Sequence, residues 1–237
     1  MEGFEGKVAV VTGGCGGIGQ AVILALREAG AKAVALDVQP APDKIPALVC
    51  DVRDDASVEE AVRQVHFEHG RLDFAIHAAG VSRDAVVWKL AVEDWDRILA
   101  INLRGAFLLL RHAVPLMRQQ GGRAVLIGSI NGSRGKFGTS AYSASKAGLL
   151  GLAKSVARET GKFGITVNVI EPGWVRTPLT EAVPKQIRDA AVAESLLGTL
   201  LEPSDVAGAV LYLCGPGGAR ITGQILRVDS GQYLGAS

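Results

Sequence analysis

The chain has few cysteines, and their placement suggests neither a disulfide framework nor a thiolate metal site. Cys15, Cys50 and Cys214 are an odd number among 237 residues, widely spaced and without a CxxC pair. We expect all three to be reduced and at least two to be buried. His66 and His69 have no third ligand nearby and no HExxH motif, so the sequence predicts no metal site.

An excess of charge of one sign is also missing, because 25 Lys and Arg face 24 Asp and Glu, a formal net charge of +1. This balance argues against nucleic acid as a partner, since proteins that bind a phosphate backbone usually carry a basic excess. No uninterrupted apolar run approaches the roughly 20 residues of a membrane span. The first residues, Met1 to Glu5, are acidic where a signal peptide would be basic. We therefore expect a cytoplasmic protein that does not bind a membrane.

Apolar residues and glycine are plentiful instead. Hydrophobic residues make up 48% of the chain and charged residues 21%, which is enough apolar material to bury a core. The 30 glycines fall between apolar runs, and we find no linker, internal repeat or low-complexity tract. Residues 1–237 are therefore expected to form a single domain.

Short apolar segments alternate with segments of helical periodicity along the whole chain. The expected strands are 7–11, 33–36, 47–50, 72–77, 123–127, 166–170 and 224–228, and the expected helices are 18–29, 57–69, 93–117, 141–160 and 204–213. The strands are apolar throughout, as burial on both faces of a parallel sheet requires, and the helices are long enough for βαβ crossovers. The predicted fold is α/β, a doubly wound, mostly parallel sheet with helices on both faces.

A glycine-rich loop lies where the first strand should meet its helix. It contains Gly13, Cys15, Gly16, Gly17, Ile18 and Gly19. Residues without a Cβ let backbone amides approach a pyrophosphate at the helix N-terminus. The spacing is wider than GxGxxG and a structural turn is the alternative, but the flanking strand and helix favour dinucleotide binding.

Asp37 ends the second strand, where a carboxylate can accept hydrogen bonds from the hydroxyls of an adenosine ribose. The same carboxylate repels a 2′-phosphate, and neither Gly16 nor Val38 supplies a cation to hold one. The sequence therefore predicts NAD(H) in preference to NADP(H). Asp51 and Val52 follow the third strand and are a predicted adenine contact, with a turn before the next helix as the alternative.

Tyr142 and Lys146 are four residues apart, on one face of an expected helix. A free tyrosine has a pKa near 10, so proton transfer near neutrality needs a stabilised phenolate. Lys146 together with a cationic nicotinamide would lower the Tyr142 pKa, although a YxxxK pair by itself is usually only a surface pair.

Two polar residues accompany this pair. Ser129 follows an apolar strand at its carboxyl end, where its hydroxyl could polarise a carbonyl. Asn102 stands inside a long apolar helix, where its amide needs partners, so we expect a bound water or a local distortion of the helix there. The alternative for Asn102 is a buried amide whose hydrogen bonds are satisfied.

Taken together, these residues resemble the short-chain dehydrogenase/reductase family. The resemblance covers essentially the whole chain and rests on Thr12-Gly13-x-x-x-Gly17-Ile18-Gly19, Asp51-Val52, His77-Ala78-Ala79-Gly80, Asn102, Ser129, Tyr142-x-x-x-Lys146, Pro172-Gly173 and Ile221-Thr222-Gly223. It implies a seven-stranded Rossmann sheet. By this resemblance, Tyr142 is the general acid/base and Ser129 orients and polarises the substrate oxygen. Lys146 then holds the nicotinamide ribose, and Asn102 fixes a water in the proton relay.

The resemblance also implies further cofactor contacts. These are Ala79, Gly80, Tyr142, Lys146, Pro172, Gly173, Val175 and Thr177. His77 and Ala78 stand where the family usually has two asparagines, and His77 can still hydrogen-bond across strands. A homotetramer is implied as well, with helices 93–117 and 141–160 packing against symmetry mates.

Within the family, the stretches 80–95 and 177–204 most resemble 3-oxoacyl-acyl-carrier-protein reductases. Those enzymes generally use NADPH and carry a basic residue in the glycine loop, whereas Gly16 and Asp37 stand here. We therefore expect an NAD(H)-dependent enzyme that interconverts a small ketone and a secondary alcohol, its substrate a 3-oxoacyl or 3-hydroxyacyl thioester. The alternatives are a dehydrogenase of a sugar, polyol or steroid, and a regulator that senses NAD(H) without turnover. A pure sensor has no use for all four catalytic residues.

Residues 178–202 form an amphipathic stretch with several leucines. We interpret this stretch as a mobile lid over an apolar substrate, with a packed surface helix as the alternative.

Overall fold

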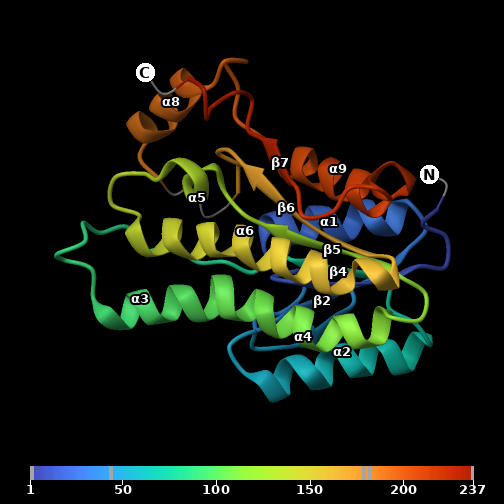
Figure 1. Ribbon diagram of the computed structural model, residues 1–237. Helices are drawn as coiled ribbons and strands as arrows, with labels where there is room; N and C mark the ends of the chain where they lie inside the picture. Colours follow the sequence, from blue (N-terminus) through green and yellow to red (C-terminus); the bar gives the residue numbers. More distant parts are fainter. Residues whose placement is uncertain (1–2, 43–44, 178–179, 181–182, 236–237) are drawn as a thin grey trace.

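The computed structural model describes residues 3–42, 45–177, 180 and 183–235. Its centre is a seven-stranded parallel sheet in the order β3-β2-β1-β4-β5-β6-β7 (Figure 1). The strands are β1 (Val8–Thr12), β2 (Lys32–Asp37), β3 (Ala47–Val49), β4 (Phe74–His77), β5 (Gly122–Ile127), β6 (Ile165–Pro172) and β7 (Ile225–Val228). The predicted doubly wound α/β sheet of seven strands is confirmed, and each strand lies within two residues of its expected bounds.

Helices cover both faces of this sheet (Figure 1). Helices α1 (Gly17–Glu28) and α9 (Pro203–Cys214) pack on one face, and α2 (Asp55–His69), α4 (Gly105–Met117) and α6 (Ser140–Thr160) pack on the other. In β1, Val8 and Val10 join the core under α2, α4 and α6, whereas Ala9 and Val11 join the core under α1 and α9. Burial on both faces explains why the strands are apolar throughout.

The expected helix 93–117 is one helical run whose geometry changes in the middle. Helix α3 (Val92–Leu99) continues through five residues of π-helix, η1 (Ala100–Arg104), into α4. Asn102 lies buried within η1, so the predicted local distortion is found at that residue. Single turns of π-helix are often found at functional sites.

The run Val92–Met117 is, by length and composition, long and apolar enough to cross a membrane, although charged residues such as Arg104 and Arg111 interrupt it. Its buried residues Leu108, Leu109 and Met117 belong to the core beneath the sheet. A core helix passes the same test of length and hydropathy, and we interpret this run as a core helix.

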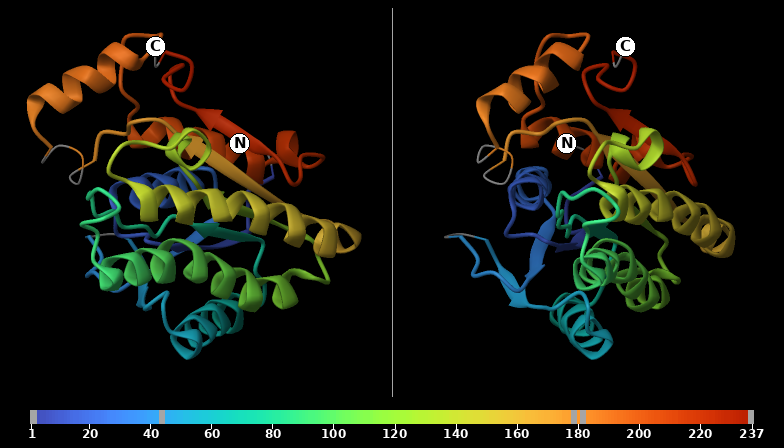
Figure 2. Two further views of the ribbon diagram at one scale, coloured as in Figure 1. Left: turned by 60° about the vertical axis from the view of Figure 1, so that its left-hand side comes forward. Right: turned by 90° about the vertical axis from the view of Figure 1, so that its left-hand side faces the viewer.

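Two shorter helices lie at the carboxyl edge of the sheet: α5 (Ile130–Arg134), which the sequence does not predict, and α8 (Lys185–Glu194), which falls within the amphipathic stretch 178–202. Both views in Figure 2 show α8 beyond the end of the sheet, beside the C-terminal segment. Just after α8, the Leu197 N–H donates a hydrogen bond of 3.1 Å to the Ser230 carbonyl. The expected lid 178–202 contains α8, while 178–179 and 181–182 lie outside the described residues. The mobility of this stretch stays a prediction.

Candidate active site

The carboxyl ends of the parallel strands bring most of the predicted site residues to one edge of the sheet. The glycine loop follows β1, Asp37 ends β2, Ser129 follows β5 and Pro172 ends β6. Open α/β sheets bind their ligands at this edge.

The glycine loop has the close packing that its sequence predicts. Gly13 has a φ of +66°, and a Cβ there would lie 2.6 Å from the backbone Cα and N of Ala79. Glycine is therefore required for the turn between β1 and α1 to lie against the end of β4. Helix α1 begins after Gly16 with no side-chain cap hydrogen bond and no acidic residue in its first turn. Its free N–H groups and its macrodipole suit an anionic group such as a phosphate.

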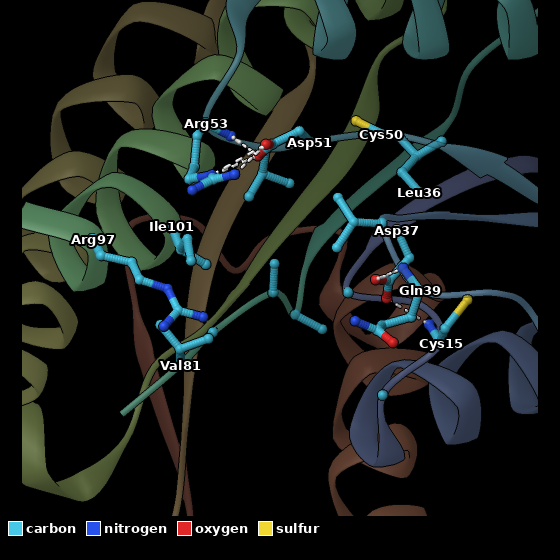
Figure 3. Close-up of a pocket in the computed structure, with 17 residues that line it drawn as sticks. Cys15, Leu36, Asp37, Gln39, Cys50, Asp51, Arg53, Val81, Arg97 and Ile101 are labelled. Carbon is cyan, nitrogen blue, oxygen red and sulfur yellow. Dashed lines mark hydrogen bonds and ion pairs between the residues drawn. The ribbon is translucent and has the colours of Figure 1, made fainter. Parts of the chain in front are cut away.

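A cleft of about 370 Å³ opens beside this loop (Figure 3). Nine of the predicted cofactor residues line it: Gly13, Cys15, Gly16, Asp37, Val38, Asp51, Val52, Ala79 and Gly80. Eight residues that the sequence does not predict complete the lining: Leu36, Gln39, Cys50, Arg53, Ala78, Val81, Arg97 and Ile101. A signal existed for two of these, because Arg97 and Ile101 are four residues apart on the helical run that carries Asn102.

Asp37 ties the glycine loop to the end of β2. Its Oδ2 accepts a hydrogen bond from the Cys15 N–H and its Oδ1 accepts one from the Gln39 N–H, each at 3.0 Å. Figure 3 shows these three residues together on one side of the cleft, across from Arg53 and Arg97. The end of the cleft nearest the glycine loop therefore holds a carboxylate, and the cations lie on the far side.

Asp51 lines the cleft and takes part in the turn before α2, while its contact with adenine stays a prediction. Its carboxylate lines the cleft but pairs with the Arg53 guanidinium, with 2.6 Å between Oδ2 and Nη2. Hydrogen bonds from Arg53 hold the pKa of Asp51 below its usual range. The Asp51 N–H donates to the Ser57 hydroxyl of α2 at 3.0 Å, so the residue also forms the turn before this helix.

Ser129, Tyr142 and Lys146 come together at the end of β5. The Ser129 hydroxyl lies near enough to the Tyr142 phenol to act on its pKa, which it lowers. Lys146 Nζ lies 5.7 Å from the centre of the Tyr142 ring and donates to the Ile127 carbonyl at 2.8 Å. Lys146 is only 4% exposed, so this ammonium is held in a fixed place inside the protein.

Asn102 connects this group to the loop after β4. Its Oδ1 accepts from the Val81 N–H at 2.8 Å, and its Nδ2 donates to the Val81 carbonyl and to Ser145 Oγ, each at 3.0 Å. Ser145 Oγ in turn donates to the Tyr142 carbonyl at 2.7 Å. The Asn102 amide therefore joins the edge of the cleft to the helix that carries Tyr142.

Gly80 marks the place where the cleft meets these residues. A Cβ on Gly80 would lie 3.3 Å from Lys146 Nζ and 3.6 Å from Asn102 Oδ1. The cleft and the polar group at Tyr142 are therefore two parts of one site.

Comparison with known proteins agrees with this architecture. The family model described as Enoyl-(Acyl carrier protein) reductase matches residues 13–232. The chain is 35% identical to the 3-oxoacyl-(acyl-carrier-protein) reductase FabG of Thermotoga maritima, over 98% of this chain and 99% of the relative. It is 33% identical to the acetoacetyl-CoA reductase of an Acinetobacter species, over 97% and 99% of the two chains. A solved short-chain dehydrogenase/reductase from Serratia marcescens is 35% identical, covers 97% and 99% of the two chains, and has a TM-score of 0.91.

The chain belongs to the short-chain dehydrogenase/reductase family. The predicted resemblance, including that to the 3-oxoacyl-acyl-carrier-protein reductases, is thereby confirmed. Membership of this family makes the chain an oxidoreductase.

The acid-base properties of this short-chain dehydrogenase/reductase differ from the expectation in one respect. Burial raises the pKa of Tyr142 and the charge of Asp84 adds to this, while the Ser129 hydroxyl acts in the opposite direction. Burial lowers the pKa of Lys146 to about 8. The lowered Tyr142 pKa expected from the sequence is therefore not found in the protein alone, because loss of solvation outweighs the effect of the Ser129 hydroxyl.

His77 replaces an asparagine of the usual family motif and keeps a structural contact. Its Nδ1 lies 2.8 Å from Thr12 Oγ1, so the predicted hydrogen bond between strands is confirmed. Burial, helped by the positive charge of Lys146, lowers the pKa of His77 to about 3. The imidazole is therefore neutral at physiological pH and links β4 to β1.

The remaining predicted cofactor residues lie outside the lining of the cleft in Figure 3. They are Gly17, Ile18 and Gly19 in the first turn of α1, Tyr142 and Lys146 on α6, and Pro172, Gly173, Val175 and Thr177 at and after the end of β6. Val175 is buried and pairs with Leu201, and the Thr177 N–H donates to Thr180 Oγ1 at 2.8 Å. Their contacts with a cofactor stay predictions.

Proposed function

We propose that this oxidoreductase uses NAD(H) to interconvert a ketone and a secondary alcohol, and that its substrate is a 3-oxoacyl thioester. The observation that carries the proposal is the meeting of Ser129, Tyr142 and Lys146 beside a cleft that ends at Asp37. The printed names of two relatives, a 3-oxoacyl-(acyl-carrier-protein) reductase and an acetoacetyl-CoA reductase, support the thioester.

The residues of the cleft fit a dinucleotide. The uncapped N-terminus of α1 would hold the pyrophosphate, and the Asp37 carboxylate would accept from the ribose hydroxyls. When bound, the nicotinamide supplies the hydride. Asp37 would repel a 2′-phosphate, and the adjoining Gly16 and Val38 are uncharged, so we propose a preference for NAD(H) over NADP(H).

In reduction, Tyr142 donates its phenolic proton to the carbonyl oxygen, and in oxidation it accepts the proton of the alcohol. The Ser129 hydroxyl donates a hydrogen bond to the same oxygen and stabilises the charge that develops there. Lys146 supplies a fixed positive charge beside the phenol. Because the protein alone raises the Tyr142 pKa, we assign the rest of the required lowering to the positive charge of the oxidised cofactor.

Asn102 acts on this chemistry from a distance. Its amide is occupied by Val81 and Ser145, so we propose that it fixes the helix of Tyr142 against the cleft. The water of the proton relay at Asn102, a homotetramer and a cytoplasmic location also belong to the proposal.

The proposed substrate class is tested by initial rates. The reduction of acetoacetyl-CoA is compared with the oxidation of a panel of secondary alcohols. Each reaction is run with both nicotinamide cofactors, so that cofactor preference does not hide an active substrate. Fast reduction of the thioester, abolished in Tyr142→Phe, is the expected result. Turnover of a sugar, polyol or steroid alcohol without turnover of the thioester would keep the catalytic residues and discard the acyl substrate. Binding of NADH without any turnover would instead indicate a sensor.

A further inference from the structure

A polar junction lies beyond Ser129, where three segments far apart in the sequence meet: α5, α8 and the C-terminal segment. It consists of Arg134, Glu194 and Gln232. Arg134 donates to Glu194 Oε2 at 2.9 Å and to the Gln232 carbonyl at 3.1 Å. The Gln232 side-chain amide donates to the same Glu194 oxygen at 3.1 Å. Each of the three residues therefore contacts the other two.

The junction is largely shielded from solvent. Gln232 is 4% exposed, and the side chains of Arg134 and Glu194 are 14% and 35% exposed. Burial acts to raise the pKa of Glu194, but hydrogen bonds from Arg134 and Gln232 outweigh it, so the pKa is lowered and the carboxylate stays ionised. Hydrogen bonds to a charged group in such surroundings are stronger than neutral ones, and removing one partner leaves the others unsatisfied.

Two short connections lead from the junction to the proposed reaction centre. Arg134 Nε donates to Asn131 Oδ1 at 3.2 Å, and the Asn131 N–H donates to Ser129 Oγ at 3.2 Å. On the other side, Gln232 Oε1 accepts from the Trp174 N–H at 2.8 Å, directly after Pro172-Gly173. Glu194, the last residue of α8, is thereby connected both to the serine and to the loop after β6.

We infer that Arg134, Glu194 and Gln232 are positioning residues that hold α8 in one place relative to Ser129 and to the loop after β6. This inference rests on the proposed function, because α8 belongs to the stretch expected to cover the substrate. None of the three residues touches the proposed reacting atoms. Their effect is on the wall of the substrate site, while the cofactor cleft at Asp37 is built without them.

A double-mutant cycle with Arg134→Ala, Glu194→Ala and the double variant tests whether the residues act as a unit. We expect each single variant to raise KM for the substrate about tenfold with a smaller change in kcat, and the double variant to be no worse than the worse single one. The Kd for NADH, measured by fluorescence titration, should change less than about twofold. Asp189→Asn is the matched control, since Asp189 forms an exposed ion pair with Lys185 on the same helix.

Hydrogen–deuterium exchange of the backbone amides of α8 gives a readout that does not depend on turnover. We expect faster exchange across 185–194 in Arg134→Ala and Glu194→Ala, unchanged exchange in the sheet, and no effect of Asp189→Asn. Gln232→Glu keeps the acceptor for the Trp174 N–H but places a negative charge against Glu194. This variant should also speed exchange in α8, and it replaces Arg134→Ala in the test if that variant does not fold.

Additive effects on KM, or exchange in α8 that matches the wild type, would overturn the inference even if the enzyme is active. If the chain turns over no substrate, faster exchange confined to α8 still supports the junction. In that case the proposed function is wrong, but the inference about the junction still holds.

Discussion

The cofactor side and the substrate side of the site are held together by different interactions. On the cofactor side, backbone groups and glycines dominate: Asp37 binds the N–H of Cys15, and Gly13 packs on Ala79. On the substrate side, charged side chains join segments that are 60 residues apart between Arg134 and Glu194. The shape of the cofactor cleft therefore depends on close backbone packing that requires glycine, whereas the substrate wall depends on pairs of charged and polar side chains. Mutations on the two sides should have different consequences.

Tyr142→Phe, at the meeting point of the two sides, should have the largest effect. Loss of the phenolic proton is expected to lower kcat by about 10³-fold, because general acid-base catalysis contributes on this scale. NADH binding and thermal stability should be retained. Steady-state rates and fluorescence titration measure the two properties, with Tyr212→Phe on the exposed face of α9 as control. A Tyr142→Phe enzyme that keeps most of its kcat would refute the assigned role.

Glu171→Ala breaks the buried charge pair of the substrate side. Glu171 is completely buried, accepts from Ser133 Oγ at 2.5 Å and pairs with Arg227 at 3.0 Å. We expect a loss of roughly 3 kcal/mol in the free energy of unfolding, since Arg227 and Ser133 lose their acceptor. Urea denaturation measures the loss. The control Asp189→Ala, in an exposed pair with Lys185, should cost about 0.5 kcal/mol. Equal losses in the two variants would contradict a special role of the buried pair.

On the cofactor side, we expect changes of charge at residues 37 and 38 to alter the cofactor preference more than the stability of the protein. Asp37→Ser combined with Val38→Arg removes the carboxylate and supplies a cation for a 2′-phosphate. We expect the ratio of kcat/KM for NADH to that for NADPH to fall by roughly 100-fold, because like charges brought together cost several kcal/mol. Asp51→Asn, on the same cleft, should leave this ratio largely unchanged. An unaltered ratio in the double variant would show that Asp37 does not select the cofactor.

Asp73, at the amino edge of the sheet, lies away from both sides and should affect stability alone. Burial acts to raise its pKa, but hydrogen bonds from Arg71 and Lys7 outweigh it, so the pKa is lowered. A lowered pKa contributes stability above the usual carboxyl range, and this contribution is lost as the pH falls through the folded-state value. Asp73→Asn should lose roughly 2 kcal/mol near pH 7 with unchanged kcat. In urea titrations, the difference in the free energy of unfolding between Asp73→Asn and the wild type should become smaller at acid pH. A difference that stays constant with pH would contradict the ion pairs.

The same contrast explains what the sequence could predict. The strands, the distortion at Asn102 and most residues of the cofactor cleft follow from apolar runs, glycine spacing and strand ends, which are all local signals. Helix α8 lies in a stretch whose amphipathic pattern is visible in the sequence, but the pattern does not fix how the helix packs, because only Ala191 of its ten residues is buried. The pairing of Arg134 with Glu194 and Gln232 has no local signal, since only the folded chain brings these segments together.

The most direct test of the account is the ratio of kcat/KM for NADH to that for NADPH in the unmodified protein, measured with acetoacetyl-CoA as substrate. The carboxylate of Asp37 at the end of the cleft predicts a higher kcat/KM with NADH. An equal or higher kcat/KM with NADPH would contradict it.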